Sequence, residues 1–366
     1  MYRKIWSGQG EERVSDKSIE ILKELKQYLL TGALSIEEFP KQDLLGMVHA
    51  EHDRRLKEQF SNLGEYIAIY DLLIGDALAE RNVNGLTDLV DRLIGDLQGA
   101  SSVSSDGMDR LRQVSDPVIV KRYQQKAKAV YERYPFQSLK GEVAFQGKGV
   151  IYTVITGDYD VLRDPEYVDS SFDYICFTDN KKLRSEVWNV SYLENFQKLD
   201  NARLSRKPKI LCHKFLEEYD YSIYVDGKIQ IIGNLREYIE RYSKGSPMLC
   251  FPHFTRECAY EESIACINSN ADNSETIKRQ MDEYRLEGYP VNNGLIDAAC
   301  MVRRHDDEIL QKVMECWWEE VRTKSRRDQL SIGYACWKNN FHYDLSDLFI
   351  YKNDYICKRR DRERPF

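Results

Sequence analysis

The sequence has no long hydrophobic run and none of the common nucleotide- or metal-binding signatures. No stretch offers about 18 uninterrupted apolar residues, and the N-terminus lacks the apolar segment of a signal peptide. The glycine-rich loops of dinucleotide-binding proteins and NTPases, the G-x-S-x-G elbow and the H-E-x-x-H zinc motif are absent. These absences argue against a membrane-spanning protein, the usual dehydrogenases and NTPases, α/β hydrolases and zinc proteases. They predict a cytoplasmic protein.

The cysteine spacing argues against a zinc-binding protein, and the net charge argues against a nucleic-acid-binding protein. The nine cysteines include no C-x-x-C pair and no Cys/His zinc spacing, so free thiols in a reducing compartment are predicted. A net charge of -7 argues against a nucleic-acid partner, which would require clustered Lys and Arg. With 42% hydrophobic and 31% charged residues, the chain is expected to be globular, and its 366 residues suffice for two domains.

Hydrophobic periodicity divides the chain into a helical part and an α/β part. Leucine and isoleucine recur at helical spacing in residues 18–30, 63–78 and 86–97. Short β-rich runs at residues 150–155, 174–178 and 221–225 alternate with helices, which predicts a mostly parallel sheet. The predicted organisation is listed in chain order: a helical accessory or oligomerisation region (1–135), a linker (136–148), an α/β domain (149–357) and a basic tail (358–366). For the tail, a solvated end and a peripheral contact with anionic lipid both stay open.

Polar residues follow each of the three predicted strands. Thr156, Gly157 and Asp158 follow the first, Asp179 the second, and Asp226 the third. Parallel strands place their carboxyl ends at one edge of a sheet, where ligands bind. A carboxylate at the position of Asp226 suits Mg²⁺ or Mn²⁺ held together with a substrate diphosphate. An ordinary turn aspartate in an Asp-Gly pair explains Asp226 equally well.

A cationic segment precedes the third strand. It contains Arg203, Arg206, Lys209 and His213, and a helix is expected to begin near Pro208, a favourable first-turn position. A helix start already favours an anion, and Arg and Lys there are suited to grip a diphosphate. A solvated basic helix is the alternative.

Two later segments and one isolated histidine supply the remaining candidates. The candidates for catalysis are His253, Glu261 and Asp328, those for donor binding are Arg256 and Gln329, and the candidate metal ligand is His342. Asp328 also suits the start of a helix, and a lone histidine such as His342 is more often structural.

Five motifs in this order resemble the glycosyltransferase-like domain of the plant TOD/MUCI type. They are R-x-S-R-x-P-K-x-L-x-H-K (203–214), Y-S-I-Y-V-D-G-K-I-Q (221–230), H-x-x-R-x-x-x-Y-E-E (253–262), V-R-R-H (302–305) and R-D-Q-L-S (327–331). The resemblance covers residues 151–342. It implies a GT-A, Rossmann-like mixed sheet that uses a nucleotide-diphosphate sugar with Mn²⁺ or Mg²⁺.

The resemblance also implies roles for individual residues. Asp226 resembles the second aspartate of the D-x-D metal motif, whereas Tyr224 stands where the first would be. Thr153, with Thr156 and Asp179, occupies strand positions that hold the nucleoside in such folds. Asp328 and Gln329 match a helix start that approaches the sugar.

The predicted function is transfer of a sugar from a nucleotide-diphosphate donor to a glycan or lipid-linked glycan in polysaccharide biosynthesis. The alternative is a non-catalytic subunit that binds nucleotide or glycan and scaffolds a polysaccharide assembly complex, with homo-oligomerisation through residues 1–135. A lipid amidase has less support, because the sequence offers no zinc-binding triad of histidines.

Overall fold

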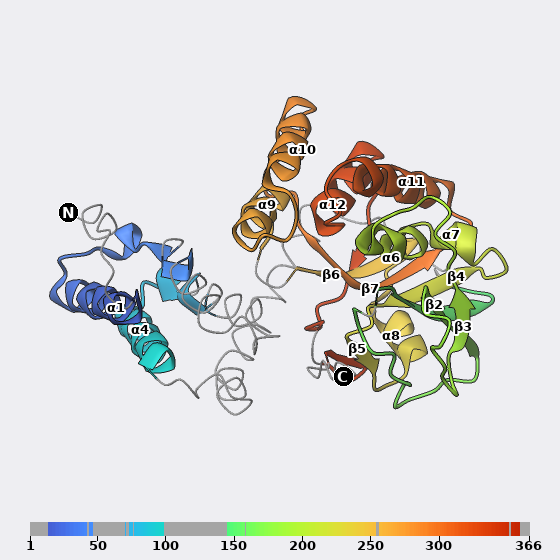
Figure 1. The fold of residues 1–366 in the computed structure, drawn as a ribbon, viewed down its shortest axis with the longest axis horizontal. Coiled ribbons are helices and arrows are strands. Elements are labelled where there is room, and N and C mark those ends of the chain that lie inside the picture. The colour runs from blue at the N-terminus through green and yellow to red at the C-terminus, as the bar shows by residue number, and fades with distance from the viewer. Residues whose placement is uncertain are drawn as a thin grey trace. The chain divides into compact units, whose positions relative to one another are not determined.

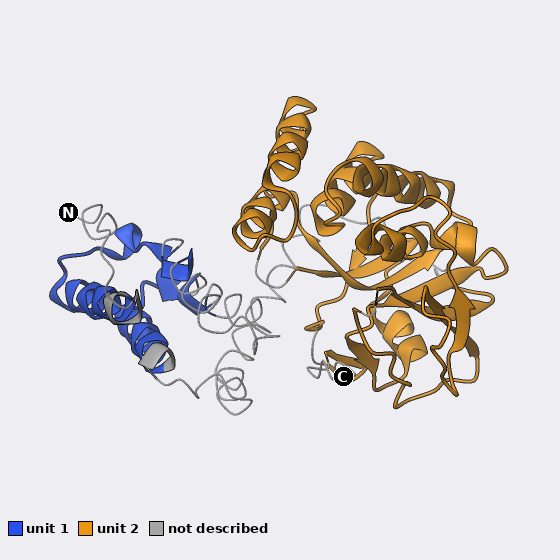
Figure 2. Ribbon diagram, in the orientation of Figure 1, with its two compact units in different colours: residues 1–121 blue, residues 122–366 orange. Residues whose placement is uncertain are grey.

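The computed structural model describes residues 14–41, 44–46, 70, 73–75, 77–98, 145–157, 159–253, 256–350 and 353–358. The chain divides into two compact units, residues 1–121 and residues 122–366, which Figure 2 colours separately. Among the described residues, no helix is long and apolar enough to cross a membrane.

The first unit is helical where it is described, as the sequence predicts. Its elements are α1 (Val14–Thr31), the short 3-10 helix η2 (Ile36–Glu38) and α4 (Val83–Gln98). Leu22 and Leu25 of α1 are buried together with Leu86 of α4, and these helices pack on each other. The predicted helices at residues 18–30 and 86–97 are confirmed. The one predicted at 63–78 lies partly outside the described residues.

The second unit is built on a mixed, mostly parallel sheet, which confirms the predicted fold class (Figure 1). Its seven strands run in the order β3-β2-β1-β4-β7-β6-β8. Their bounds are β1 (Gly149–Ile155), β2 (Phe172–Thr178), β3 (Asn189–Tyr192), β4 (Tyr221–Val225), β6 (Met248–Pro252), β7 (Ile296–Arg304) and β8 (Asp344–Leu345). Only β7 pairs antiparallel with its neighbours. The start of β7 therefore lies at the same edge as the carboxyl ends of β1, β2 and β4.

Helices cover both faces of this sheet. On one face lie α6 (Asn201–Ile210), α7 (Cys212–Phe215), α11 (Glu308–Thr323) and α12 (Gln329–Lys338), whereas α8 (Leu235–Tyr242) packs on the other (Figure 1). The pair α9 (Ala259–Asn268) and α10 (Ser274–Leu286) packs beside α12. A second, two-stranded sheet joins β5 (Ile229–Ile231) to β9 (Ile356–Lys358). Lys358, the first residue of the predicted basic tail, thus ends a strand, and residues 359–366 lie outside the described residues.

The prediction that a helix begins near Pro208 is wrong. The helix begins at Asn201, where the Asp200 side chain accepts a hydrogen bond from the backbone N–H of Arg203 at 3.0 Å. Pro208 lies in the last turn of α6, so its missing N–H costs the helix only one late hydrogen bond. Lys209 therefore sits at the carboxyl end of the helix dipole, the end that favours cations.

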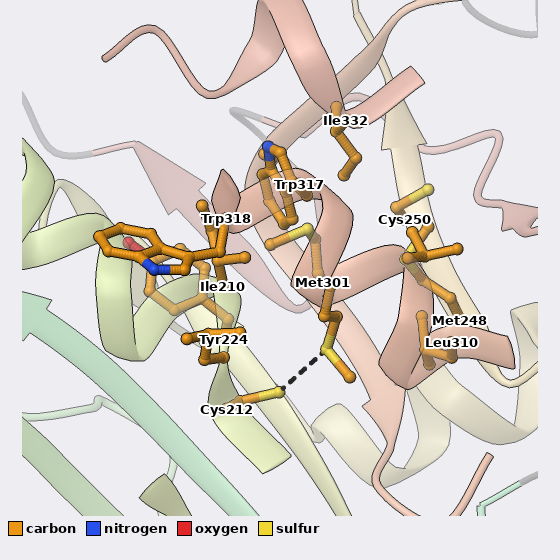
Figure 3. Packing of buried hydrophobic residues seen from close by; sticks show 14 of the residues in the cluster. Ile210, Cys212, Tyr224, Met248, Cys250, Met301, Leu310, Trp317, Trp318 and Ile332 are labelled. Carbon is orange, nitrogen blue, oxygen red and sulfur yellow. Dashed lines mark hydrogen bonds between the residues drawn. The ribbon is translucent and has the colours of Figure 1, made fainter. Parts of the chain in front are cut away.

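The main core lies between the sheet and α6, α11 and α12. Trp317 and Met301 are buried at its centre, with Ile210, Tyr224 and Cys212 on the α6 side (Figure 3). Every second residue of β1 from Val150 to Val154 packs into this layer, as does Tyr224 of β4. The core thereby fixes the position of α6 over the carboxyl edge of β1 and β4.

Candidate functional site

The tips of β1 and β2 are joined to the start of α6. Gly157 adopts a left-handed conformation with φ of 64°, and its N–H donates to the Asp179 carboxylate at 3.0 and 3.2 Å. The Thr156 hydroxyl donates to the backbone oxygen of Asn201 at 2.8 Å. A Cβ at Gly157 would come within 2.1 Å of the Asn201 side chain, so a larger residue would have to displace that side chain as well as adopt the left-handed conformation. Asp158 lies outside the described residues.

Asp226 lies at the tip of β4 among cationic groups. Its backbone N–H extends the ladder to β7 by donating to the Ala299 oxygen at 2.8 Å. Its carboxylate accepts a hydrogen bond from the Tyr224 hydroxyl at 2.6 Å and faces the ammonium groups of Lys209 at 3.6 Å and Lys228 at 3.4 Å. Burial alone would raise the pKa of Asp226, but Lys209 and Lys228, together with Arg206 and the Tyr224 hydroxyl, outweigh burial and hold the pKa below its usual value. The side chain remains 23% exposed, so an oxygen of this carboxylate can be reached from outside.

Lys209 connects Asp226 to Asp328. Its buried ammonium lies 2.6 Å from Asp328 Oδ2, and Arg206 Nε lies 3.5 Å from Oδ1 of the same carboxylate. Asp328 directly precedes α12, and its backbone oxygen accepts a hydrogen bond from the Trp317 indole at 2.9 Å, which fixes this helix start against α11. Residues from β4, α6 and α12 thus converge in one ion-pair cluster at the carboxyl edge of the sheet.

The charge state of Asp328 limits its chemistry. Burial raises the pKa of this carboxyl group, but Lys209 and Arg206 outweigh burial and hold the pKa far below its ordinary value. A carboxylate held so firmly in its ionised form is a poor proton acceptor near neutral pH. Of the roles open to a catalytic carboxylate, Asp328 is suited to stabilising positive charge rather than to taking a proton.

A second cluster centres on Glu262 rather than on the predicted Glu261. Glu262 is buried and accepts a hydrogen bond from Arg256 Nε at 2.5 Å, with His253 Nε2 at 3.9 Å and Arg327 Nη2 at 4.0 Å from its carboxylate. Glu261, one residue earlier on α9, is exposed.

A sequence signal for Glu262 exists. Cys258 and Cys266, four residues before and after it, share its helix face and are buried.

The geometry of His253 fixes which ring nitrogen carries its proton. Nδ1 accepts a hydrogen bond from the backbone N–H of Arg256 at 3.2 Å. In the neutral ring the proton therefore resides on Nε2, which faces Glu262. Nδ1 is consequently engaged and is not available to take a proton from a substrate in this arrangement.

Three of the predicted donor-binding residues are not members of either ion-pair cluster. The Arg203 guanidinium donates to the backbone oxygens of Val321 and Lys324 and to Asp200, so it joins α6 to the end of α11. Thr153 is buried in the middle of β1, three residues before the tip. Gln329 lies beside Asp328 and accepts a hydrogen bond from Arg327 at 3.4 Å.

His342 lies at the opposite edge of the sheet from Asp226. It precedes β8, which runs parallel to β6 and hence to β4, so it sits at the amino ends of the strands. The strands β7 and β6 separate β8 from β4, a lateral distance of about 14 Å. This placement corrects the prediction that His342 joins Asp226 as a metal ligand. Among the described residues, no group of three or more His, Cys, Asp or Glu side chains is arranged to hold a metal.

His213 on α7 also lies outside the cluster, and its environment gives a testable pH effect. Burial, assisted by the Lys214 ammonium, lowers the pKa of His213 to about 4, and neither ring nitrogen has a hydrogen-bond partner among the described residues. The folded pKa lies below the unfolded value of about 6.5, so the unfolded state binds the proton more tightly. The contribution of neutral His213 to the free energy of unfolding is therefore fully present above pH 6.5 and is lost as pH falls towards 4.

Stability curves of the His213→Leu variant test this prediction. The free energy of unfolding of the wild type should fall between pH 7 and pH 4.5 more steeply than that of His213→Leu, measured by urea titration. Parallel curves for the wild type and His213→Leu would contradict the assignment.

The family of the chain is shown by sequence comparison. The family described as TOD1/MUCI70, glycosyltransferase-like domain, matches residues 140–361, which is more than half of the chain. The chain belongs to this family. The resemblance predicted from the five ordered motifs is therefore confirmed.

A curated relative and two solved structures are similar to parts of the chain. The "Probable hexosyltransferase MUCI70" of Arabidopsis thaliana is 25% identical over 165 residues, which cover 42% of this chain and 28% of the relative. The apo crystal structure of mouse xyloside xylosyltransferase 1 has a TM-score of 0.29 and 12% identity, covering 54% of this chain and 85% of that one. The mannosyltransferase Ktr4p of S. cerevisiae has a TM-score of 0.27 and 9% identity, covering 59% and 72%. Likeness at these TM-scores says nothing about the site, whereas the family and the curated relative support a glycosyltransferase.

The family motifs meet in the ion-pair cluster. Arg206 and Lys209 come from the first motif, Asp226 from the second and Asp328 from the fifth, and ion pairs link all four. Lys228, which the sequence argument did not select, lies in the second motif and faces the Asp226 carboxylate together with Lys209. The third motif supplies the adjacent Glu262 cluster.

Proposed function

We propose that the second unit transfers a sugar from a nucleotide-diphosphate donor to a glycan or lipid-linked glycan in polysaccharide biosynthesis, using a GT-A type of site. The observation that supports this proposal best is the Lys209 ammonium placed between Asp226 and Asp328 at the carboxyl edge of a parallel sheet. Such edges hold ligands in open α/β folds, and transfer of a sugar requires a site for the departing diphosphate.

The cations at this edge are suited to hold that diphosphate. Arg206, Lys209 and Lys228 carry three positive charges against the two negative charges of Asp226 and Asp328. Lys209 Nζ lies 3.6 Å and Lys228 Nζ 3.4 Å from the Asp226 carboxylate, and each ammonium has three N–H donors, so either can donate to a phosphate oxygen while keeping its carboxylate partners. Fixed cations aimed at the leaving group lower the barrier because they stabilise the charge that grows there.

Asp226 fits a divalent cation in one respect: it offers a partly exposed carboxylate at a strand tip. Mg²⁺ or Mn²⁺ is commonly bound by one or two carboxylates together with substrate phosphates. When bound, the ion would polarise the phosphate oxygens and stabilise the charge developing on the diphosphate. Lys209 and Lys228 would flank the same phosphates, and the Tyr224 hydroxyl would keep the carboxylate oriented.

The remaining residues are assigned by the elements that carry them. Thr156, Gly157 and Asp179 shape the loop where the nucleoside would lie. The Glu262 cluster and Gln329 would face the sugar and acceptor. Asp328, kept ionised, is suited to stabilise the positive charge that develops on the sugar during transfer.

A scaffold subunit that binds nucleotide without turnover is the second candidate. The observation that favours it is Tyr224, which stands where the first carboxylate of D-x-D is expected and donates a hydrogen bond to Asp226. Homo-oligomerisation through residues 1–135, a cytoplasmic location and peripheral membrane contact stay predictions of the sequence.

A donor screen separates the two candidates. Purified protein is incubated with UDP-, GDP-, CMP- and ADP-linked sugars, with and without Mn²⁺, and both the melting temperature and donor hydrolysis are measured. A ligand at 100 times its Kd should stabilise the fold by about 2.7 kcal/mol. We expect one diphosphate sugar to raise the melting temperature and to be hydrolysed. Stabilisation without turnover, across many acceptors, would support the scaffold, and no response to any donor would refute both.

A further inference from the structure

The carboxyl end of α6 carries Lys209 and is held by two fully buried side chains. A helix leaves its last carbonyl oxygens without partners in the helix, and here α6 ends at Ile210 before α7 begins. Arg303 Nη2 donates to the Lys209 carbonyl oxygen at 2.7 Å, and Nη1 approaches the Ile210 oxygen at 3.4 Å. The Tyr152 hydroxyl donates to the same Lys209 oxygen at 2.9 Å. Two elements of the sheet, β7 and β1, thus grip one residue of α6.

The two gripping side chains are also bonded to each other. Arg303 Nη2 donates to the Tyr152 hydroxyl at 2.5 Å, and both side chains have no solvent exposure. The Tyr152 ring packs against Phe177 and Tyr224 at centroid distances of 6.2 and 5.3 Å, which fixes the direction of its hydroxyl. The hydrogen bonds to the Lys209 carbonyl oxygen are therefore made by buried side chains that packing holds in place, and not by mobile side chains at the surface.

A buried guanidinium in this position is costly and needs a reason. In the described part of the chain, no Asp or Glu forms an ion pair with Arg303, although an unpaired buried charge is strongly unfavourable. The negative end of the α6 dipole offsets part of this cost. The Cys212 thiol offsets another part: burial raises its pKa, but Arg303 and His305 outweigh burial and bring the pKa to about 6. Apolar residues of similar size would fill the same volume without this cost.

We propose that Arg303 and Tyr152 are positioning residues, which hold the Lys209 backbone so that its ammonium stays between Asp226 and Asp328. The V-R-R-H motif, which the donor site does not use, thereby acquires a role. Arg303 does not touch the substrate, and its effect passes through Lys209. The effect on catalysis rests on the proposed transferase function, whereas the effect on the geometry of Lys209 does not.

Conservative variants remove the hydrogen bonds to the Lys209 carbonyl oxygen without leaving a large cavity in the core. Arg303→Lys keeps a positive charge but removes the fork that reaches two carbonyl oxygens. Tyr152→Phe removes only the hydroxyl. Arg304→Lys is the matched control, because Arg304 follows directly on β7 but points to Asp306 at the surface. Thermal melts establish that each variant is folded, and Tyr152→Phe carries the test if Arg303→Lys does not fold.

The decisive measurement is a double-mutant cycle with Lys209→Met. Arg303→Lys should lower kcat for donor turnover by about tenfold to a hundredfold with a smaller change in KM, since a misplaced group costs this much in the transition state. In the Lys209→Met background, Arg303→Lys should change kcat less than twofold. Arg304→Lys should behave as the wild type in both backgrounds. Independent, multiplicative effects of Arg303→Lys and Lys209→Met would overturn the proposal.

Crystal structures of Arg303→Lys and Tyr152→Phe provide a readout that needs no substrate. The separation between Lys209 Nζ and Asp328 Oδ2, 2.6 Å in the wild type, should lengthen in both variants. An unchanged separation would refute the positioning role whether or not the protein is a transferase. Absence of turnover and of nucleotide binding in the wild type would instead refute the proposed function alone.

Discussion

Replacing Lys209 by methionine should lower kcat for sugar transfer by about 10²- to 10³-fold, because it removes a fixed cation aimed at the departing diphosphate. Methionine keeps the length of the buried stem, so loss of the charge rather than of packing is measured. The variant should also bind a nucleoside diphosphate more weakly, since in the proposed site the ammonium would contact the bound diphosphate before transfer as well. Steady-state kinetics and calorimetry measure the two effects separately.

Lys207→Met is the matched control for this prediction. Lys207 lies two residues earlier on α6, and its ammonium donates to the Gln197 side chain at 3.0 Å. It should retain wild-type kinetics. Equal losses in Lys207→Met and Lys209→Met would show that general electrostatics, or the stability of α6, explains the effect.

The second large effect is expected for Asp226→Asn. The substitution removes the carboxylate charge while keeping its shape, and it should reduce kcat by about 10²- to 10³-fold and weaken the response to Mn²⁺. The physical reason is that the proposed site offers the ion one protein carboxylate, at the tip of β4. Activity measured across a Mn²⁺ titration, for the wild type and the variant, gives both numbers.

Asp220→Asn is the control for Asp226→Asn. Asp220 is exposed and directly precedes β4, as Asp226 directly follows it, and its carboxylate accepts a hydrogen bond from the backbone N–H of Lys148 at 2.6 Å. We expect Asp220→Asn to cost a little stability and no activity. If Asp226→Asn keeps full activity and its Mn²⁺ response, the metal assignment is wrong.

The strands and their polar tips were predictable from the sequence. Three β-rich runs match β1, β2 and β4 within two residues, because buried parallel strands are short and continuous in apolar residues. The cluster around Asp226 followed from the rule that parallel strands bring their carboxyl ends together. Of the two predicted neighbours of Asp226, Lys209 lies 3.6 Å from its carboxylate, whereas Arg206 forms its ion pair with Asp328; the reason for selecting them was partly incorrect.

That reason was the position of Pro208. Proline is favoured in the first turn of a helix, but an asparagine or aspartate cap seven or eight residues earlier competes with it, and here Asp200 caps α6. Lys209 therefore contacts Asp226 from the end of α6, where side chains point back over the sheet. A proline in the last turn costs α6 only one late hydrogen bond, so a proline alone does not mark where a helix begins, whereas the Asp200 cap does.

Side-chain direction, strand order and burial explain the other differences between the site predicted from the sequence and the site in the structure. Glu261 and Glu262 are identical in type and adjacent, and only the helix phase set by the buried cysteines separates them. His342 lies far from Asp226 because β8 pairs with β6 at the edge of the sheet. The order of strands in a sheet is a tertiary property, which the spacing of residues in the sequence does not reveal. Arg303 was quoted within the V-R-R-H motif but given no role, because arginine usually lies at the surface and its full burial is not evident from the sequence.

The most direct test of the central claim is a crystal structure with the nucleoside diphosphate that stabilises the protein most, in the presence of Mn²⁺. We predict that the diphosphate lies against the Lys209 and Lys228 ammonium groups, with the ion on Asp226 and the nucleoside near the loop of Gly157. A diphosphate bound away from Lys209 and Asp226 would contradict this account of the site.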